Sequence, residues 1–301
     1  MAGFYKVVTG VIMSTHKSLL GILISLVLGA LILAAGSSSS ISLWNVPMFF
    51  LCGSLGFLLH WLVFIPSYLN STEHYFDLTG SISYVLIALA ACYASPILHV
   101  RDLIICAMIL IWALRLGSFL FLRVKKAGQD RRFEVMKHNF LWFLMTWTLG
   151  GLWVLITLGA GLAAITSSVK LDIGFYGFLG IFLWAVGFLV EVISDNQKTE
   201  FRKIEENKDK FMNTGLWSWS QHPNYFGEIL LWLGVACISF PVLSGAQLAT
   251  LISPIFVYFL LTRVSGIPLL DRLADKKWGD SVAYTEYKKT TSPLFLLPPR
   301  K

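Results

Sequence analysis

Residues 139–166 read NFLWFLMTWTLGGLWVLITLGAGLAAIT, an unbroken apolar stretch without a charged side chain. A transmembrane helix needs about 20 predominantly apolar residues, so this stretch is long enough to cross a bilayer. Comparable runs lie on both sides of it, at 19–35, 44–66, 78–98, 103–122, 173–193, 225–240 and 248–262. The last two are short and are separated by Pro241 and Gly245, so they form either two helices or one broken helix. We therefore expect an all-α, polytopic membrane helix bundle with about seven to eight transmembrane helices.

The overall composition also indicates a chain that is embedded in lipid. Of its 301 residues, 56% are hydrophobic and 14% are charged, whereas charged residues make up about 25% of typical soluble domains. So few charges cannot cover a water-facing surface. A soluble globular enzyme, a disordered chain and a nucleic-acid-binding protein with a charged face are thereby excluded.

The basic residues predict how the chain crosses the membrane. They are concentrated in three segments, at 123–138, 195–222 and 263–301. The connections between these segments carry almost no Lys or Arg, at 36–43, 99–102, 167–172 and 241–247. Because Lys and Arg stay on the cytoplasmic side, we expect both termini and the basic loops to be cytoplasmic. The membrane would be the inner membrane in a bacterium and the endoplasmic reticulum in a eukaryote. The sequon at Asn70 then lies on the cytoplasmic side, so we expect it to stay unmodified.

Two residue types commonly used for metal binding are arranged without a metal-site pattern. The four cysteines are scattered through apolar runs and no pair has CxxC spacing, so we interpret them as buried inert thiols. The six histidines show no HxxxH spacing, so we expect no metal site.

Arg115 lies in the middle of an apolar run, where a charged side chain costs about 2.5–3.5 kcal/mol on insertion scales. It is expected to face either a ligand site or a structural partner, such as Glu191 or Glu228. Arg123 follows two turns later on nearly the same face. Together with residues 130–132 (Asp-Arg-Arg), it forms a basic stripe that leaves the membrane.

A second polar face begins at the end of the 173–193 run. Glu191, Asp195, Lys198 and Arg202 follow one another at steps of three and four residues. This spacing places all of them on one side of a helix that continues into the cytoplasm. A ligand-binding face and a solvated ion-pair face have the same pattern, so both interpretations stay open.

The segment GLWSWSQHPNYFGE, residues 215–228, is the strongest local signal. Pro223 suits the first turn of a helix, with His222 or Ser220 near its N-cap. The free backbone N–H groups at such a helix start attract a phosphate.

Within the same segment, Asn224 and Glu228 lie four residues apart on one helical face, with Tyr225 beside them. A carboxylate one turn inside an apolar span needs a partner. Gly227 permits close approach of backbone or ligand, and Gly174 and Gly180 are small residues that favour close helix packing.

The C-terminal tail is amphipathic and rich in aromatic and basic residues. It is expected either to lie on the membrane surface or to fold back over a ligand.

These blocks resemble the steroid 5-alpha-reductase superfamily, and most closely its bacterial-type branch, over roughly residues 75–298. The resemblance is carried by three motifs: Trp112-x-x-Arg115…Arg123, Asp195-x-x-Lys198-x-x-Phe201-Arg202 followed by Gly215-Leu216-Trp217, and Asn224-Tyr225-Phe226-Gly227-Glu228. Before the resemblance begins, we expect N-terminal transmembrane helices over 1–74. Residues 75–301 would form a steroid-reductase-like domain with cytoplasmic cofactor-binding loops. The tail is also similar to that of sterol C14 reductases, in Asp271, Lys277, Trp278, Gly279, Tyr284 and Tyr287.

The resemblance implies NADPH-dependent reduction of a carbon–carbon double bond in a steroid, sterol or other lipid enone. The expected partners are therefore a hydrophobic small molecule and the membrane, without nucleic acid. By position, it assigns cofactor binding to Arg115, Arg123, Asp195, Lys198, Arg202, Trp217, His222, Asn224, Tyr225, Glu228, Arg272, Tyr284 and Tyr287.

One position departs from the family. Steroid reductases carry a tyrosine three residues before the arginine that Arg115 matches, and here that residue is Trp112. An indole donates a hydrogen bond but is not an acid. We therefore expect the catalytic residues to be Tyr84, Tyr225 and Glu228, with Glu73 as a further candidate proton donor.

Two alternative functions remain open. Isoprenylcysteine carboxyl methyltransferases carry a similar Arg-His-Pro-x-Tyr stretch and use S-adenosylmethionine. Here Gln221 stands at the position of that arginine, which favours the reductases. The alternatives are thus a methyltransferase acting on a prenyl or lipid substrate and a non-enzymatic lipid-binding membrane protein.

Overall fold

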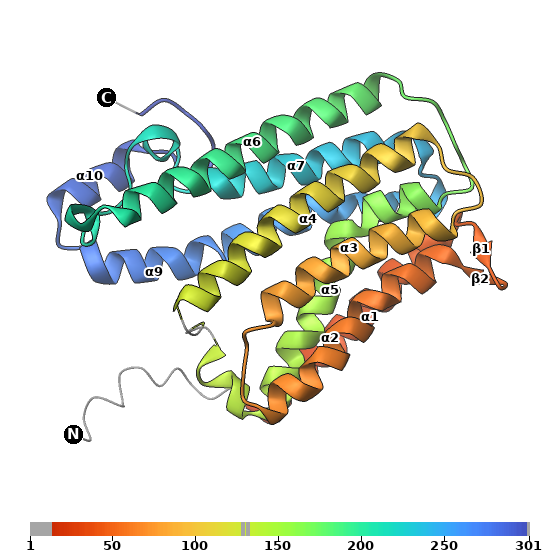
Figure 1. Cartoon of the computed structure of the whole chain (residues 1–301), viewed down its shortest axis with the longest axis horizontal. Helices are drawn as coiled ribbons and strands as arrows, with labels where there is room; N and C mark the ends of the chain where they lie inside the picture. The colour runs from red at the N-terminus through yellow and green to blue at the C-terminus, as the bar shows by residue number, and fades with distance from the viewer. Residues whose placement is uncertain (1–13, 128–129, 131–132, 300–301) are drawn as a thin grey trace. The chain divides into compact units, whose positions relative to one another are not determined.

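The computed structural model describes residues 14–127, 130 and 133–299 (Figure 1). Arg131 and Arg132 of the predicted basic stripe lie outside the described residues. The α-helices are α1 (Thr15–Ser37), α2 (Met48–Leu69), α3 (Phe76–Ala94), α4 (Val100–Ala127), α5 (Phe140–Thr166), α6 (Phe175–Lys203), α7 (Pro223–Ser239), α8 (Ser253–Phe259), α9 (Ile267–Trp278) and α10 (Val282–Thr290).

Short elements connect these helices. A hairpin of two strands, β1 (Ser42–Leu43) and β2 (Val46–Pro47), follows α1. The 3₁₀ helices are η2 (Met136–His138), η3 (Glu205–Asn207), η4 (Gly215–Ser218), η5 (Phe240–Val242) and η6 (Gly245–Ile252), and η7 (Leu260–Val264) is a π-helix.

Among the described residues, eight helical segments are long and apolar enough to cross a membrane. This finding confirms the predicted all-α polytopic fold, and the protein is an integral, multi-pass membrane protein. The segments 223–242 and 245–278 are separate spans, so the two last apolar runs are not one helix. The last span is itself irregular, because α8 passes through the π-helix η7 before α9 begins.

The chain forms two compact units. The first comprises Met1–Asp172 with Val242–Thr250, and the second comprises Ile173–Pro241 with Leu251–Lys301.

In the first unit, α5 is the central helix. It packs against α1, α2, α3 and α4, and nearly all of its side chains from Trp147 onwards are buried. The Asn139 side chain caps its start by accepting a hydrogen bond from the backbone N–H of Trp142 at 3.1 Å. The apolar stretch that predicts the fold therefore forms the core of this unit.

Charged side chains in the first turn of α4 contact the connection between α5 and α6. Lys170 Nζ lies 2.7 Å from Asp102 Oδ2, and the Arg101 guanidinium donates to the backbone carbonyl of Asp172 at 2.6 Å. Asp102 thereby neutralises Lys170, the basic residue of the connection 167–172.

In the second unit, α6 and α7 are antiparallel and pack through glycines. Gly187 faces Gly227 and Gly180 faces Gly234, and a Cβ atom at any of them would lie within 2.6 Å of backbone on the other helix. Close packing is thereby confirmed for Gly180. Gly174 instead precedes α6 and has open space around its Cα.

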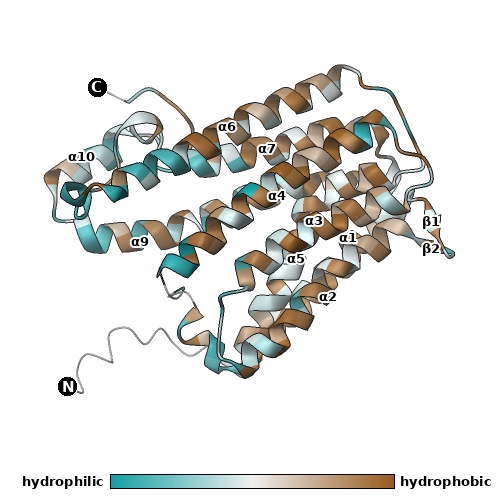
Figure 2. Ribbon diagram, viewed as in Figure 1, coloured by the Kyte–Doolittle hydropathy of each residue, from teal (hydrophilic) through white to brown (hydrophobic). Residues whose placement is uncertain are grey.

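This close approach positions polar side chains of the two helices. Figure 2 shows α6 changing from apolar to hydrophilic towards its C-terminal end. Glu191 and Asp195 lie on the buried side of that transition, at 2% and 7% exposure. Opposite them, α7 begins with Pro223 in its first turn, as predicted.

The tail folds back against the segment 204–222 of its own unit (Figure 1). The Trp278 indole donates to the carbonyl of Asp209 at 2.6 Å, and the Tyr287 hydroxyl donates to the carbonyl of Trp217 at 2.7 Å. The tail therefore docks on its own unit, and its placement relative to a membrane surface or a ligand stays a prediction.

Candidate functional site

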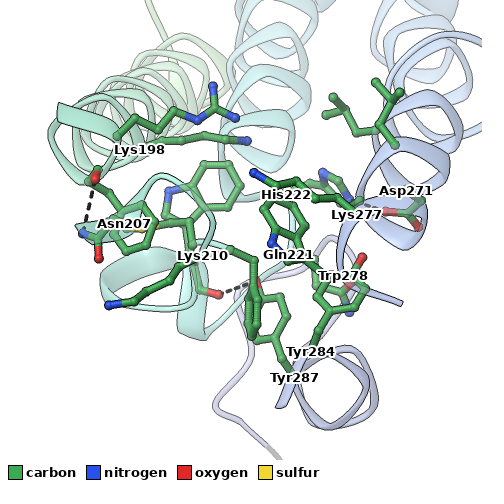
Figure 3. A pocket seen from close by; sticks show the side chains of 18 of the residues that line it. Lys198, Asn207, Lys210, Gln221, His222, Asp271, Lys277, Trp278, Tyr284 and Tyr287 are labelled. Carbon is green, nitrogen blue, oxygen red and sulfur yellow. Dashed lines mark hydrogen bonds and ion pairs between the residues drawn. The ribbon is translucent and has the colours of Figure 1, made fainter. Parts of the chain in front are cut away.

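A cavity of about 550 Å³ opens in the second unit, where the end of α6, the segment 204–222, α9 and α10 meet (Figure 3). Its size falls within the range of about 300–1,000 Å³ that is typical of ligand sites. It is lined by Lys198, Phe201, Arg202, Asn207, Lys208, Lys210, Phe211, Met212, Trp217, Gln221, His222, Leu270, Asp271, Leu273, Ala274, Lys277, Trp278, Tyr284 and Tyr287.

One wall of the cavity is an aromatic cluster centred on Phe211. The ring centroid of Phe211 lies 5.2 Å from that of Tyr284, 5.3 Å from that of Tyr287 and 6.2 Å from that of Trp278. Burial raises the pKa of both tyrosines, so their hydroxyls stay protonated at neutral pH. Flat, rigid surfaces of this kind suit the stacking of a planar ring.

Cationic side chains dominate the rest of the lining. Lys198 Nζ lies 4.2 Å above the Trp217 ring, in a cation–π contact. Lys277 Nζ is 3.0 Å from Asp209 Oδ1, a pair that is largely exposed to solvent. The lining contains the basic residues Lys198, Arg202, Lys208, Lys210 and Lys277, against the single acidic residue Asp271. This excess of positive charge favours an anionic ligand.

A buried polar cluster lies between α6 and α7, one helical turn from the cavity-lining Lys198. The Asn224 side-chain amide donates to Asp195 Oδ1 at 3.2 Å. Glu228, at 9% exposure, comes from the same face of α7 as Asn224. The polar faces of the two helices therefore meet within this unit.

His222 links the polar cluster to the cavity. It directly precedes α7 and its ring stacks on Tyr225, with centroids 5.6 Å apart and an interplanar angle of 8°. Its Nε2 lies 3.4 Å from Asp271 Oδ1. Burial lowers the pKa of His222, while Asp271 opposes that shift.

The predicted cofactor residues of the second unit fall into two groups. The first group lines the cavity: Lys198, Arg202, Trp217, His222, Tyr284 and Tyr287. The second lies in the helix pair and is not part of the lining: Asp195, Asn224, Tyr225 and Glu228. Arg272 belongs to neither group, because it is exposed while its neighbours Asp271 and Leu273 line the cavity.

Other predicted residues belong to the first unit. Tyr84 of α3 is buried, and its ring packs edge-on against Trp112 of α4, with centroids 5.1 Å apart. Arg115 is half-buried with its guanidinium 5.4 Å above the Phe119 ring, and Arg123 is exposed. Their functional roles stay predictions.

Glu73 is also in the first unit. Burial acts to raise the pKa of this carboxyl, but the hydrogen bonds from Lys137 and the backbone of Asp130 lower it overall. The carboxylate lies 2.8 Å from Lys137 Nζ. A group held ionised in this way is poorly suited to donate a proton, which argues against Glu73 as the catalytic acid.

Sequence reasoning did not select the cavity-lining residues of the 207–212 segment. The sequence feature that could have identified them is Phe211, an aromatic side chain inside a strongly charged loop. Lys277 and Trp278 belong to the tail motif that resembles sterol C14 reductases, which by itself assigned them no role. Both line the cavity, because the tail folds back.

Comparisons with known proteins point to one family. Residues 63–291 match the model of a family described as proteins of unknown function, DUF1295. The curated 3-oxo-5-alpha-steroid 4-dehydrogenase 1 of Homo sapiens is 32% identical over 88 residues, covering 29% of this chain and 30% of that protein. The Bos taurus protein of the same name is 35% identical over 63 residues, covering 21% and 24%.

The aligned segments thus span less than a third of the curated relatives that they match. No solved structure matches the chain significantly.

Proposed function

Because this chain belongs to the DUF1295 family, within the steroid 5-alpha-reductase superfamily, we propose that it is an integral membrane oxidoreductase that uses NADPH. Its substrate would be a steroid, sterol or other lipid enone, in which one carbon–carbon double bond is reduced.

The observation that carries the proposal is the aromatic and cationic cavity of the second unit. NADPH has two planar rings, a pyrophosphate and a 2′-phosphate. The cavity offers the ring faces around Phe211 and the five basic side chains of its lining. The chemistry of the residues present therefore fits this cofactor.

Within that cavity, Arg202 is our candidate for the 2′-phosphate. Its guanidinium presents several donors in a planar fork that suits phosphate oxygens. Lys198 is held over Trp217, close to the start of α7, where free backbone N–H groups also favour an anion. Tyr284 and Tyr287 would close the cavity over the adenosine end.

The reduction adds one hydride and one proton across the double bond, and bound NADPH would supply the hydride to the beta carbon. The chain would supply the proton and polarise the carbonyl oxygen. Tyr225 is our first candidate, since its ring is fixed by the stack on His222. Glu228, which is buried one turn further along α7, would help to bind the cofactor. Tyr84 is the candidate from the first unit, because it contacts Trp112.

The alternative methyltransferase function is less well supported. The Gln221 side chain donates to the backbone carbonyls of Lys288 and Thr291, at 3.1 and 2.8 Å. It therefore fastens the tail, and both of its amide donors are already used by backbone carbonyls.

Thermal melting of the purified protein in mild detergent tests the proposal. NADPH is expected to raise the melting temperature and S-adenosylmethionine to leave it unchanged, because only a ligand that binds the native state stabilises it. A shift with S-adenosylmethionine alone would support the methyltransferase. No shift with either, in folded protein, would support a non-enzymatic lipid-binding role.

A further inference from the structure

His222 lies at the edge of the cavity and combines a buried ring with ring nitrogens that lack hydrogen bonds to any described residue. Its ring is buried, at 6% exposure, yet within the described residues neither ring nitrogen makes a hydrogen bond. Leaving a buried polar atom without a hydrogen bond costs about 1–3 kcal/mol. The contact that Nε2 does have is the carboxylate of Asp271, at 3.4 Å.

Charged groups from three other helices surround this ring. Asp271 of α9 favours the protonated imidazole, whereas Lys198 of α6 and Lys288 of α10 oppose it. Tyr225 of α7 covers one ring face. Burial and the two lysines lower the pKa of His222 in the free protein, and negative charge added nearby would raise it.

Asp271 is itself held in place. Lys288 Nζ lies 3.8 Å from Asp271 Oδ2 and 2.8 Å from Asp275 Oδ1. Asp275 also accepts a hydrogen bond from the Tyr284 hydroxyl at 3.1 Å. The carboxylate that faces His222 is thus fixed by a network that joins α9 to α10.

We infer that Asp271 is a positioning residue: it orients His222 and stabilises its imidazolium when an anionic ligand fills the cavity, so that ligand binding is coupled to uptake of one proton. The inference rests on the proposed function, with NADPH as the anion. The free Nδ1 then gains a proton that it can donate to the ligand.

Two measurements on the purified full-length protein test the pair. The first needs no ligand: an NMR titration of the isotope-labelled His222 ring. In Asp271→Asn the pKa of His222 is expected to fall further, because the group that raises it is gone. Asp280→Asn is the matched control, because Asp280 is an exposed acidic residue shortly after α9 that does not line the cavity. It should leave the His222 titration unchanged.

The second measurement is calorimetry of NADPH binding in two buffers of different ionisation enthalpy. The wild type is expected to take up a proton and to bind roughly tenfold more weakly at pH 8 than at pH 6, the factor that one pKa unit of linkage gives. Asp271→Asn should lose the proton uptake, and Asp280→Asn should keep it.

Unchanged His222 titration and unchanged proton uptake in Asp271→Asn would overturn the inference. If that variant does not fold, His222→Gln decides, because it must bind NADPH without proton uptake. If neither the wild type nor any variant binds NADPH, the proposed function is contradicted. The ligand-free titration would still test the contact between His222 and Asp271.

Discussion

At the scale of single residues, the role of Arg202 can be tested separately from the general attraction of a basic cavity for anions. Replacing it with alanine should raise the Kd for NADPH about tenfold, since a charge-assisted hydrogen bond contributes about 1.5–3 kcal/mol and Arg202 is partly solvated. NADH, which lacks the 2′-phosphate, should lose little affinity. Fluorescence titration with both nucleotides measures the difference.

Lys203→Ala is the control for this change. Lys203 is adjacent, equally basic and exposed, but it pairs with Glu200 at 2.6 Å and does not line the cavity. Equal weakening of NADPH and NADH in Arg202→Ala would show that Arg202 does not contact the 2′-phosphate.

Glu228 is the second residue with a distinct prediction. Glu228→Gln keeps the size of a side chain that is 9% exposed, so the protein should still insert and fold. Turnover should be abolished, because the buried carboxylate belongs to the polar cluster that would face the cofactor. Turnover assays on protein with an unchanged melting temperature measure this. Full activity in Glu228→Gln would remove the residue from the site.

At the scale of elements, the α6–α7 pair sets the geometry of the polar cluster. Gly227→Ala would place a Cβ atom 2.6 Å from the carbonyl oxygen of Gly187. Overpacking of this kind costs about 1–3 kcal/mol. The melting temperature should fall by several degrees and NADPH binding should weaken, because the helices that carry Asp195 and Asn224 move apart.

Gly174→Ala serves as the comparison, since no atom lies within 4 Å of the added Cβ. It should change stability by no more than about 0.5 kcal/mol. If Gly227→Ala is as stable and binds NADPH as tightly as Gly174→Ala, close glycine packing is not what positions the cluster.

The elements also show what sequence can and cannot predict. The spans were predictable because hydropathy is a local property, as the charge-free stretch 139–166 illustrates. Helical spacing placed Asp195 and Asn224 each on a polar helix face, and the resemblance singled them out, but the hydrogen bond between them was not predicted. The cavity was not predictable either, because it needs the tail to dock on the 204–222 segment. That docking depends on tertiary hydrogen bonds such as the one from Trp278 to Asp209.

At the scale of the whole molecule, the distribution of basic residues predicts which connections are cytoplasmic. Single cysteines introduced at the exposed positions Ser168 and Lys203, in a background without native cysteines, test this. A membrane-impermeant maleimide added to intact cells or right-side-out vesicles should label Ser168→Cys and spare Lys203→Cys. Labelling with the opposite preference would reverse the orientation and place the cavity away from cytoplasmic NADPH.

The most direct test of the central claim follows the hydride itself. The purified protein is incubated with NADPH that carries deuterium at the transferred position and with lipids from a strain that lacks the gene. One unsaturated lipid is expected to gain a deuterium from NADPH and a proton from solvent, detected by mass spectrometry, and Arg202→Ala should slow this transfer. If folded protein that binds NADPH transfers no deuterium to any lipid, but transfers a methyl group from S-adenosylmethionine, the reductase account is contradicted.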